Sequence, residues 1–183
     1  MPAVSIVIPM RNEAENVTPL LRGIAAACAA LEDYEVIVVD DGSTDGTEEA
    51  ALALREEINV LRVLRHAKSG GQSAAVHSGV LAAAAPVVCT LDGDGQNPPE
   101  ELPKLWAPLM EDVTGTLGLV AGQRVRRQDS LSKRLGSRFA NTLRSRLLSD
   151  GTRDTGCGMK GFRRDAFLAL PYFDHMHRFL PAL

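Results

Sequence analysis

The stretch VVCTLDGDGQNPPEEL (residues 87–102) joins a run of small and apolar residues to an acidic, glycine-rich turn. Val87–Leu91 has the composition of a buried strand, and the two prolines after the turn stand where a helix is expected to begin. Two carboxylates, Asp92 and Asp94, therefore lie between a strand and a helix. Because like charges this close repel each other, the turn either is solvated or binds a cation.

The same alternation of strand and helix extends over most of the chain. Short, mostly β-branched strands are predicted at 4–9, 35–40, 59–64, 87–91 and 117–121. Helices are predicted between them at 13–31, 45–57, 71–84 and 98–112. Strands separated by helices indicate a parallel sheet that is covered on both faces. The sequence thus predicts an α/β fold with a single open, mostly parallel sheet and helices on both faces.

The length and composition fit one domain. The chain has 183 residues, of which 45% are hydrophobic, and it shows no internal repeat or linker. Its longest apolar stretch is too short to span a bilayer, and its start does not resemble a signal peptide. Three widely spaced cysteines suggest neither a disulfide framework nor a zinc site, which favours a cytoplasmic location. We therefore expect a single domain over residues 1–183.

Polar residues gather where three of the predicted strands end. The first strand runs into Pro9-Met10-Arg11-Asn12-Glu13, the second into Asp40-Asp41-Gly42-Ser43 and the fourth into Asp92-Gly93-Asp94. In open α/β sheets, ligands bind outside the carboxyl ends of the strands. Carboxylates at this edge would suit Mg²⁺ or Mn²⁺, which prefer oxygen ligands and often bind substrate phosphates as well. For Asp92 and Asp94, a turn with Asx hydrogen bonds is the alternative.

Other ligand motifs are absent from the sequence. Neither acidic loop has the glutamate that an EF-hand needs at position 12, where Leu52 and Pro103 stand instead. No P-loop motif occurs, and no G-x-G-x-x-G follows the first strand, which disfavours a dinucleotide cofactor. His175 and His177 have no companion ligand nearby and are interpreted as a surface pair rather than a metal site. Four small residues are interpreted as allowing a helix to pack close to the sheet: Gly71, Ala74, Ala75 and Gly79.

Positive charge is concentrated in one segment, although the net charge of the chain is −3. Between residues 122 and 146 there are eight basic residues and one acidic residue. Apolar residues recur there every four positions and predict an amphipathic helix over 130–148, with Arg134, Ser137, Arg138 and Asn141 on another side. This cluster suits a phosphate, and a solvated basic face is the alternative. We expect no nucleic-acid partner, because the 4% aromatic content leaves little for bases to stack on.

Six motifs occur in an order that is typical of a known family. They are VSIVIPMRNEAEN, VIVVDDGSTDGT, SGGQSAAVHSG, CTLDGDGQNPPEEL, GQRVRRQDSLSKRLGSRFAN and DTGCGMKGFRRDAF. Together they resemble the inverting glycosyltransferases of family 2 with the A-type nucleotide-sugar-binding fold, over essentially the whole chain. More narrowly, they resemble the polyprenyl- or dolichyl-phosphate sugar transferases, such as the dolichol-phosphate mannose synthases. The resemblance implies transfer of a hexose-type sugar, with inversion, from a UDP- or GDP-sugar to a polyprenyl phosphate.

The resemblance also implies roles for individual residues. The nucleotide sugar would be bound by Pro9, Arg11, Asn12, Glu13, Asp40, Asp41, Gln72 and Asp92. Mg²⁺ or Mn²⁺ and the diphosphate would be held by Asp92, Asp94 and Gln96. The acceptor phosphate would be positioned for catalysis by Arg124, Arg134 and Ser137. Asp154 matches a position discussed as the catalytic base, although it could instead orient Arg134 or the sugar.

A lipid acceptor implies that the sugar is transferred at the cytoplasmic face of a membrane, with the predicted 130–148 helix facing the lipid headgroups. Relatives of this type commonly continue beyond the point where this chain stops. The sequence is therefore expected to be a truncated catalytic piece or to depend on a membrane-anchoring partner protein. Two alternatives stay open: a transferase of the same fold that acts on a saccharide or protein hydroxyl, and a non-catalytic nucleotide-sugar-binding protein.

Overall fold

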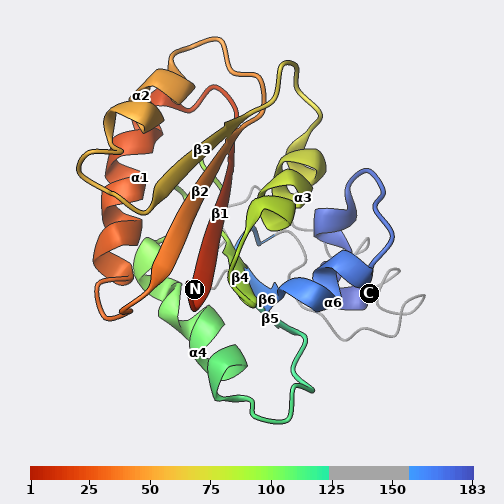
Figure 1. Cartoon of the computed structure of the whole chain (residues 1–183). Coiled ribbons are helices and arrows are strands. Elements are labelled where there is room, and N and C mark those ends of the chain that lie inside the picture. The colour runs from red at the N-terminus through yellow and green to blue at the C-terminus, as the bar shows by residue number, and fades with distance from the viewer. Residues whose placement is uncertain (124–156) are drawn as a thin grey trace, which may run out of the picture.

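The computed structural model describes residues 1–123 and 157–183, and a six-stranded sheet forms the centre of this described part (Figure 1). The strands are β1 (Val4–Met10), β2 (Tyr34–Asp40), β3 (Leu61–Arg65), β4 (Val87–Thr90), β5 (Leu119–Ala121) and β6 (Lys160–Arg163). Their order across the sheet is β3-β2-β1-β4-β6-β5. Neighbouring strands pair in parallel from β3 to β4, whereas β6 is antiparallel to both β4 and β5. The predicted open, mostly parallel sheet is confirmed.

Helices cover both faces of this sheet. They are α1 (Ala14–Ala27), α2 (Thr47–Ala53), α3 (Gln72–Ala82), α4 (Pro103–Glu111) and α6 (Arg164–Ala169), with short 3₁₀ turns η1 (Pro99–Glu101), η2 (Met176–Arg178) and η3 (Leu180–Ala182). Figure 1 shows α1, α2 and α4 on one side of the sheet, and α3 and α6 on the other. Within the described ranges, no helix combines the length and the apolar character that crossing a bilayer requires.

Two apolar clusters, one on each face, explain why the central strands have so many consecutive apolar residues. Ile6 and Ile8 of β1 pack into the cluster that contains α1 and α4, whereas Val7 packs into the cluster that contains α3. Successive side chains of a strand point to opposite faces. A strand that is covered on both sides must therefore be apolar at almost every position, as VSIVIP is.

The sequence did not predict β6 and α6. The four residues of β6 are Lys-Gly-Phe-Arg, with two charges and a glycine, so no apolar alternation marks them. Pairing with β4 places Phe162 opposite Val88 and buries it, and this tertiary contact forms the strand. Two predicted helices end earlier than expected, at Ala27 and Ala53, and the one at 98–112 is divided into η1 and α4. The predicted helix 130–148 lies outside the described residues.

Gly79 confirms the interpretation that α3 packs closely on the sheet. A Cβ at this position would lie 2.3 Å from Cγ1 of Val7 and 3.2 Å from Cγ2 of Val39. We expect Gly79→Ala to lower the free energy of unfolding by about 1–3 kcal/mol, because overpacking a close-packed core forces its neighbours to move. Urea denaturation measures this change. Gly118→Ala is the control, since its Cβ would meet nothing within 4 Å; equal midpoints for the two variants would refute the close contact.

Candidate functional site

A cavity of about 330 Å³ opens at the carboxyl ends of β1, β2 and β4. These strands are neighbours in the sheet, so the loops that follow them meet at one edge. The cavity is lined by Pro9, Met10, Arg11, Glu13, Asp41, Ser69, Gly71, Gln72, Ala75, Asp92, Gly93 and Asp94. Its size is within the range of small-molecule sites. The acids that the sequence places at separate strand ends, Asp41, Asp92 and Asp94, therefore share one cavity.

The loop after β1 is tied to the loop after β2 through Asn12. Its backbone N–H donates to Oγ of Ser43 at 2.9 Å, and its side-chain Oδ1 accepts from the N–H of Thr44 at 2.9 Å. Asn12 has a left-handed backbone with φ 55°, which asparagine tolerates better than most residues. The side chain of Asn12 is thereby used to join two loops. Its neighbours Arg11 and Glu13 line the cavity instead.

Asp41 is held in the cavity wall by four hydrogen bonds. One carboxylate oxygen is 2.7 Å from Nδ1 of His66 and 2.8 Å from the N–H of Gly70. The other accepts from Oγ of Ser69 at 2.6 Å and from the N–H of Gly71 at 2.8 Å. Burial alone would raise the pKa of Asp41, but these hydrogen bonds outweigh it and keep the pKa below its usual value. Asp41 is therefore a fixed negative charge at neutral pH.

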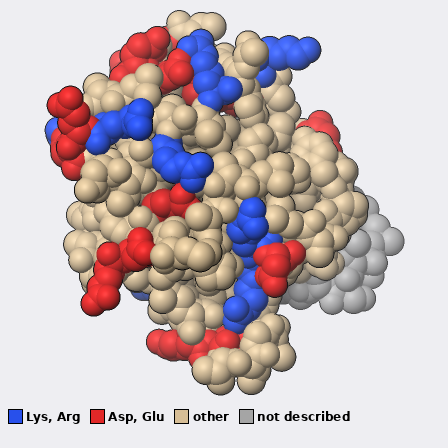
Figure 2. All heavy atoms as spheres, viewed as in Figure 1, with Lys and Arg blue, Asp and Glu red and all other residues tan. Residues whose placement is uncertain are grey.

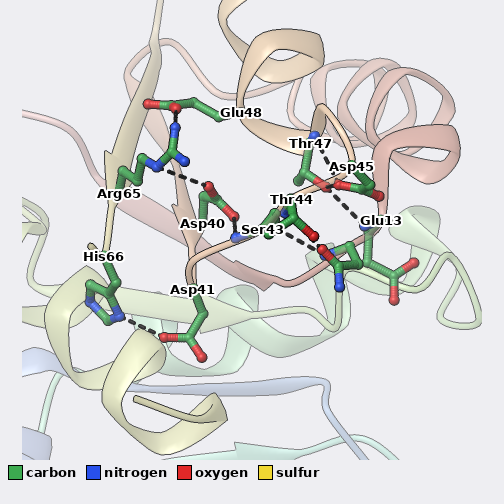
Figure 3. A network of polar contacts seen from close by, with 11 residues as sticks. Glu13, Asp40, Asp41, Ser43, Thr44, Asp45, Thr47, Glu48, Arg65 and His66 are labelled. Carbon is green, nitrogen blue, oxygen red and sulfur yellow. Dashed lines mark hydrogen bonds and ion pairs between the residues drawn. The ribbon is translucent and has the colours of Figure 1, made fainter. Parts of the chain in front are cut away.

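Asp40 points away from Asp41, toward Arg65 (Figure 3). It is fully buried, and one of its oxygens accepts from the N–H of Ser43 at 3.0 Å. The other oxygen has no hydrogen-bond partner in the described part of the chain and lies 3.8 Å from Nε of Arg65. Arg65 also forms an ion pair with Glu48. Asp40 shapes the turn after β2 and does not line the cavity, so its contact with the nucleotide sugar stays a prediction.

Asp92 and Asp94 line the cavity from the loop after β4. The side-chain amide of Gln72 donates to Oδ1 of Asp92 at 2.7 Å. The backbone at Gly158 lies so close to Asp92 that a Cβ there would be 2.0 Å from Oδ2. Asp94 accepts from the N–H of Gln96 at 3.0 Å, which is the Asx turn that the sequence left as an alternative. The turn and a cation-binding role are compatible, because a carboxylate has about four lone-pair sites.

The two carboxylates fit a divalent cation that is held partly by its substrate. In the described ranges, no three His, Cys, Asp or Glu side chains gather closely enough to form a metal cage. Mg²⁺ in nucleotide enzymes commonly uses one or two carboxylates, with substrate phosphates and waters as its other ligands. Asp92 and Asp94 offer that donor set at the cavity wall.

Comparison with known proteins places the chain in a family. The family model described as Glycosyl transferase family 2 matches residues 5–170. The chain belongs to this family. Two relatives are undecaprenyl-phosphate 4-deoxy-4-formamido-L-arabinose transferases, one of Yersinia enterocolitica and one of Pectobacterium carotovorum, each 37% identical over 185 residues. The alignments cover 98% of this chain and 54% of each relative, so the chain spans about half the length of the curated relatives it matches.

Solved structures of the same fold support the A-type assignment of this family 2 chain. A mannosyl-3-phosphoglycerate synthase of Rubrobacter xylanophilus aligns with a TM-score of 0.75 at 20% identity, covering 93% of this chain and 56% of that one. A mannosyltransferase of Pyrobaculum calidifontis in complex with GDP-Man and Mn²⁺ aligns with a TM-score of 0.66 at 24% identity, covering 90% and 45%. At these identities the likeness establishes the fold alone.

Part of the site predicted for this glycosyltransferase-family chain is not in the cavity wall. Gln96 is exposed and contributes its backbone N–H to Asp94, while Asn12 and Asp40 organise the loops. Four further residues lie outside the described ranges: Arg124, Arg134, Ser137 and Asp154. Figure 2 shows acidic and basic side chains interspersed on the face in view. Most of the segment in which the sequence concentrates positive charge, 122–146, likewise lies outside the described ranges.

Two interpretations from the sequence are corrected by the structure. Gly71 was expected to help a helix pack on the sheet, but it precedes α3 with φ +85°, lines the cavity and donates to Asp41. His177 was expected to be part of a surface pair, but it is half-buried, with its Nδ1 2.7 Å from Oγ of Ser73. Both contacts join residues that are far apart in the sequence, and no local pattern marks them.

Proposed function

We propose that this chain transfers a sugar from a UDP- or GDP-sugar to a polyprenyl phosphate. The observation that carries the proposal is the single cavity in which Asp41, Asp92 and Asp94 meet at adjacent strand ends. Family membership supports the reaction class. The relatives named for transfer to undecaprenyl phosphate support the acceptor. The neighbouring structures that contain GDP-Man or UDP support a nucleotide sugar as the donor.

The β1 and β2 loops bind the nucleoside part of the donor in this proposal. All four lone-pair sites of the Asp41 carboxylate are in use, so Asp41 acts by holding the loop 69–71 and by presenting a fixed charge. Arg11 and Glu13 extend the same wall and would contact the base and the ribose through charged and polar groups. One carboxylate oxygen of Glu13 accepts from the side-chain amide of Asn16 at 2.6 Å, so the other oxygen would make that contact. Gly71 leaves room for the diphosphate to approach the backbone closely, because a Cβ there would meet nothing within 4 Å. At Gly93 a Cβ would instead lie 2.7 Å from Cγ of Met10, so this glycine lets the loop after β4 pack against β1.

Asp92 and Asp94 would hold Mg²⁺ or Mn²⁺ against the diphosphate. The cation, when bound, would compensate the negative charge that develops on the departing nucleoside diphosphate. The chain's own contribution is to orient the two carboxylates: Gln72 fixes Asp92, and the N–H of Gln96 fixes Asp94. A neighbouring structure that contains both UDP and Mn²⁺ supports this assignment.

The acceptor side of the proposal rests on the sequence. A phosphate monoester has a second pKa of about 6, so it is largely dianionic at pH 7 and carries no proton that must be removed. Arg124, Arg134 and Ser137 would position this nucleophile through charge-assisted hydrogen bonds. Asp154 would then orient Arg134 or the sugar. With a polyprenyl acceptor, the transfer reaction would take place at a membrane surface. Cys28, Cys89 and Cys157 are buried and form no disulfide, which fits the reducing, cytoplasmic side of that membrane.

A transfer assay tests the proposal directly. The chain is incubated with Mn²⁺, undecaprenyl phosphate and a set of UDP- and GDP-sugars, and the lipid-linked product is separated from free sugar. Formation of a sugar-phosphate lipid with one of these donors is the expected result. Nucleotide binding without any transfer would favour the non-catalytic alternative, and transfer to a saccharide or protein hydroxyl would favour the other acceptor class.

Arg134→Ala is expected to raise the KM for the lipid phosphate by roughly 10- to 100-fold, the usual size of a lost charged hydrogen bond. The affinity for the nucleotide sugar should stay near that of the unchanged chain, because Arg134 is proposed to contact the acceptor only. Steady-state kinetics with each substrate varied in turn separates the two effects. Arg55→Ala, at an exposed arginine outside the cavity, is the control. An equal loss for both substrates would show that the acceptor assignment is wrong.

A further inference from the structure

The segment 176–180, which includes η2, packs against the first turn of α3. Oγ of Ser73, the second residue of α3, lies 2.7 Å from Nδ1 of His177 in η2, and the N–H of His177 lies 3.4 Å from the same oxygen. Ser73 is almost completely buried, with 1% of its surface exposed. Met176 and Leu180 flank His177 and join Ala75 in one apolar cluster. The contact is therefore a packed tertiary junction between residues 104 positions apart.

The first turn of α3 is also part of the cavity wall. Gly71 and Gln72 immediately precede Ser73, and together with Ala75 they line the cavity. The N–H of Gly71 donates to Asp41, and the side chain of Gln72 donates to Asp92. Ser73 thus follows two residues that hold carboxylates of two different loops, the one after β2 and the one after β4. A shift of this turn would move both contacts.

His177 is a neutral hydrogen-bonding group at this junction. The pKa of His177 is lowered to about 4, and burial of the ring is the largest cause. Electrostatic effects of Arg178, Lys160 and His175 act in the same direction, and that of Asp174 opposes them. At pH 7 the ring therefore has one N–H donor and one acceptor nitrogen. It contributes a hydrogen bond of fixed geometry to Ser73 and adds no charge near the diphosphate.

We propose that His177 is a positioning residue for the nucleotide-sugar site. Its hydrogen bond to Ser73 fixes the first turn of α3. This turn keeps Gln72 in the position from which it donates to Asp92. The inference rests on the proposed function, because the binding that should change is that of a nucleoside diphosphate. It extends the site beyond the cavity wall to the segment around η2. His177 does not line the cavity, so any effect on binding must be transmitted through α3.

Titration calorimetry with UDP and with GDP, each in the presence of Mn²⁺, tests the inference. His177→Ala is expected to weaken binding roughly 3- to 10-fold, as the loss of one positioning hydrogen bond would. Ser73→Ala should have the same effect, and the double variant should be no weaker than either single variant, because both changes break one contact. His177→Asn should restore most of the affinity, since its amide can replace the ring nitrogen.

The control is His175→Asn, which changes an exposed histidine of the same segment and suits the left-handed backbone there, with φ 64°. It should leave nucleotide affinity unchanged. Amide hydrogen exchange gives a readout that needs no ligand: the amides of residues 73–76 should exchange faster in His177→Ala than in His175→Asn.

Three outcomes would overturn the inference. A lower melting temperature for His177→Ala with an unchanged dissociation constant would reduce His177 to a packing role and leave the proposed function standing. Additive losses for Ser73→Ala and His177→Ala would show that the effect does not pass through their contact. If the unchanged chain bound neither UDP nor GDP with Mn²⁺, the proposed function would fail, and this inference with it. If His177→Ala does not fold, Ser73→Ala and His177→Asn decide between these results.

Discussion

Asp94→Asn is expected to weaken the Mn²⁺-dependent binding of UDP or GDP by about 100-fold or more. The loss of even an outer partner of a metal ligand typically costs about 10- to 100-fold in metal affinity, and Asp94 is proposed as a direct ligand. The amide keeps the shape of the side chain, and its oxygen can still accept from the N–H of Gln96. The loop should therefore remain folded, so that the change reports on charge rather than on structure.

The measurement is a pair of titrations with and without Mn²⁺. Without the cation, Asp94→Asn and the unchanged chain should bind the nucleotide equally weakly, whereas with it only the unchanged chain should gain affinity. Glu100→Gln is the matched control, because it also replaces an acid by its amide at an exposed position that follows the same loop and lies outside the cavity. If the heats for Asp94→Asn rose with Mn²⁺ as in the unchanged chain, the metal assignment would be wrong.

Gly158→Ala is expected to displace the carboxylate of Asp92 from the cavity wall. The added Cβ would lie 2.0 to 2.3 Å from the three carboxyl atoms of Asp92, a separation that no pair of nonbonded atoms can keep. Either Asp92 turns away from Gln72, or the backbone before β6 moves. We expect a loss of roughly 10- to 100-fold in Mn²⁺-dependent UDP or GDP binding, and a loss of about 1–3 kcal/mol in the free energy of unfolding.

A second substitution separates these two effects. Asp92→Ala, added to Gly158→Ala, removes the clash and should restore the free energy of unfolding in urea denaturation, but it should not restore nucleotide binding. Gly118→Ala is again the control for adding a methyl group to a glycine that is not crowded. Unchanged nucleotide affinity for Gly158→Ala would mean that the backbone at Gly158 does not hold Asp92 in place.

Much of the candidate site could be predicted because it follows from local patterns. Apolar runs locate β1, β2 and β4, and the residues that follow each run form the loops at one edge of the sheet. Since ligands collect at that edge in open α/β sheets, the sequence alone predicts that Asp41, Asp92 and Asp94 share one site. The cavity confirms this juxtaposition, while the roles of these residues stay predictions.

Asp40 and Asp41 have different environments, and the sequence motif does not show which of the two lines the cavity. The two residues are adjacent in the sequence, but Asp40 is buried beside Ser43 and Arg65, whereas Asp41 lines the cavity. Successive side chains at a strand end leave on opposite sides, so a pair of identical acids is divided between two environments. The face that each acid takes depends on how the strand is packed.

Apolar periodicity and turn chemistry were sufficient to predict β1 to β5, α1 to α4 and the edge at which the acids stand, because these properties repeat every two to four residues along the chain. The position of β6, the close approach of Gly158 to Asp92 and the contact of His177 with Ser73 arise only when the chain folds. Each of them joins residues more than 60 positions apart, and the free energy that selects them comes from burial in a particular packing. Such contacts depend on the order of the strands in the sheet, which a local sequence pattern does not predict.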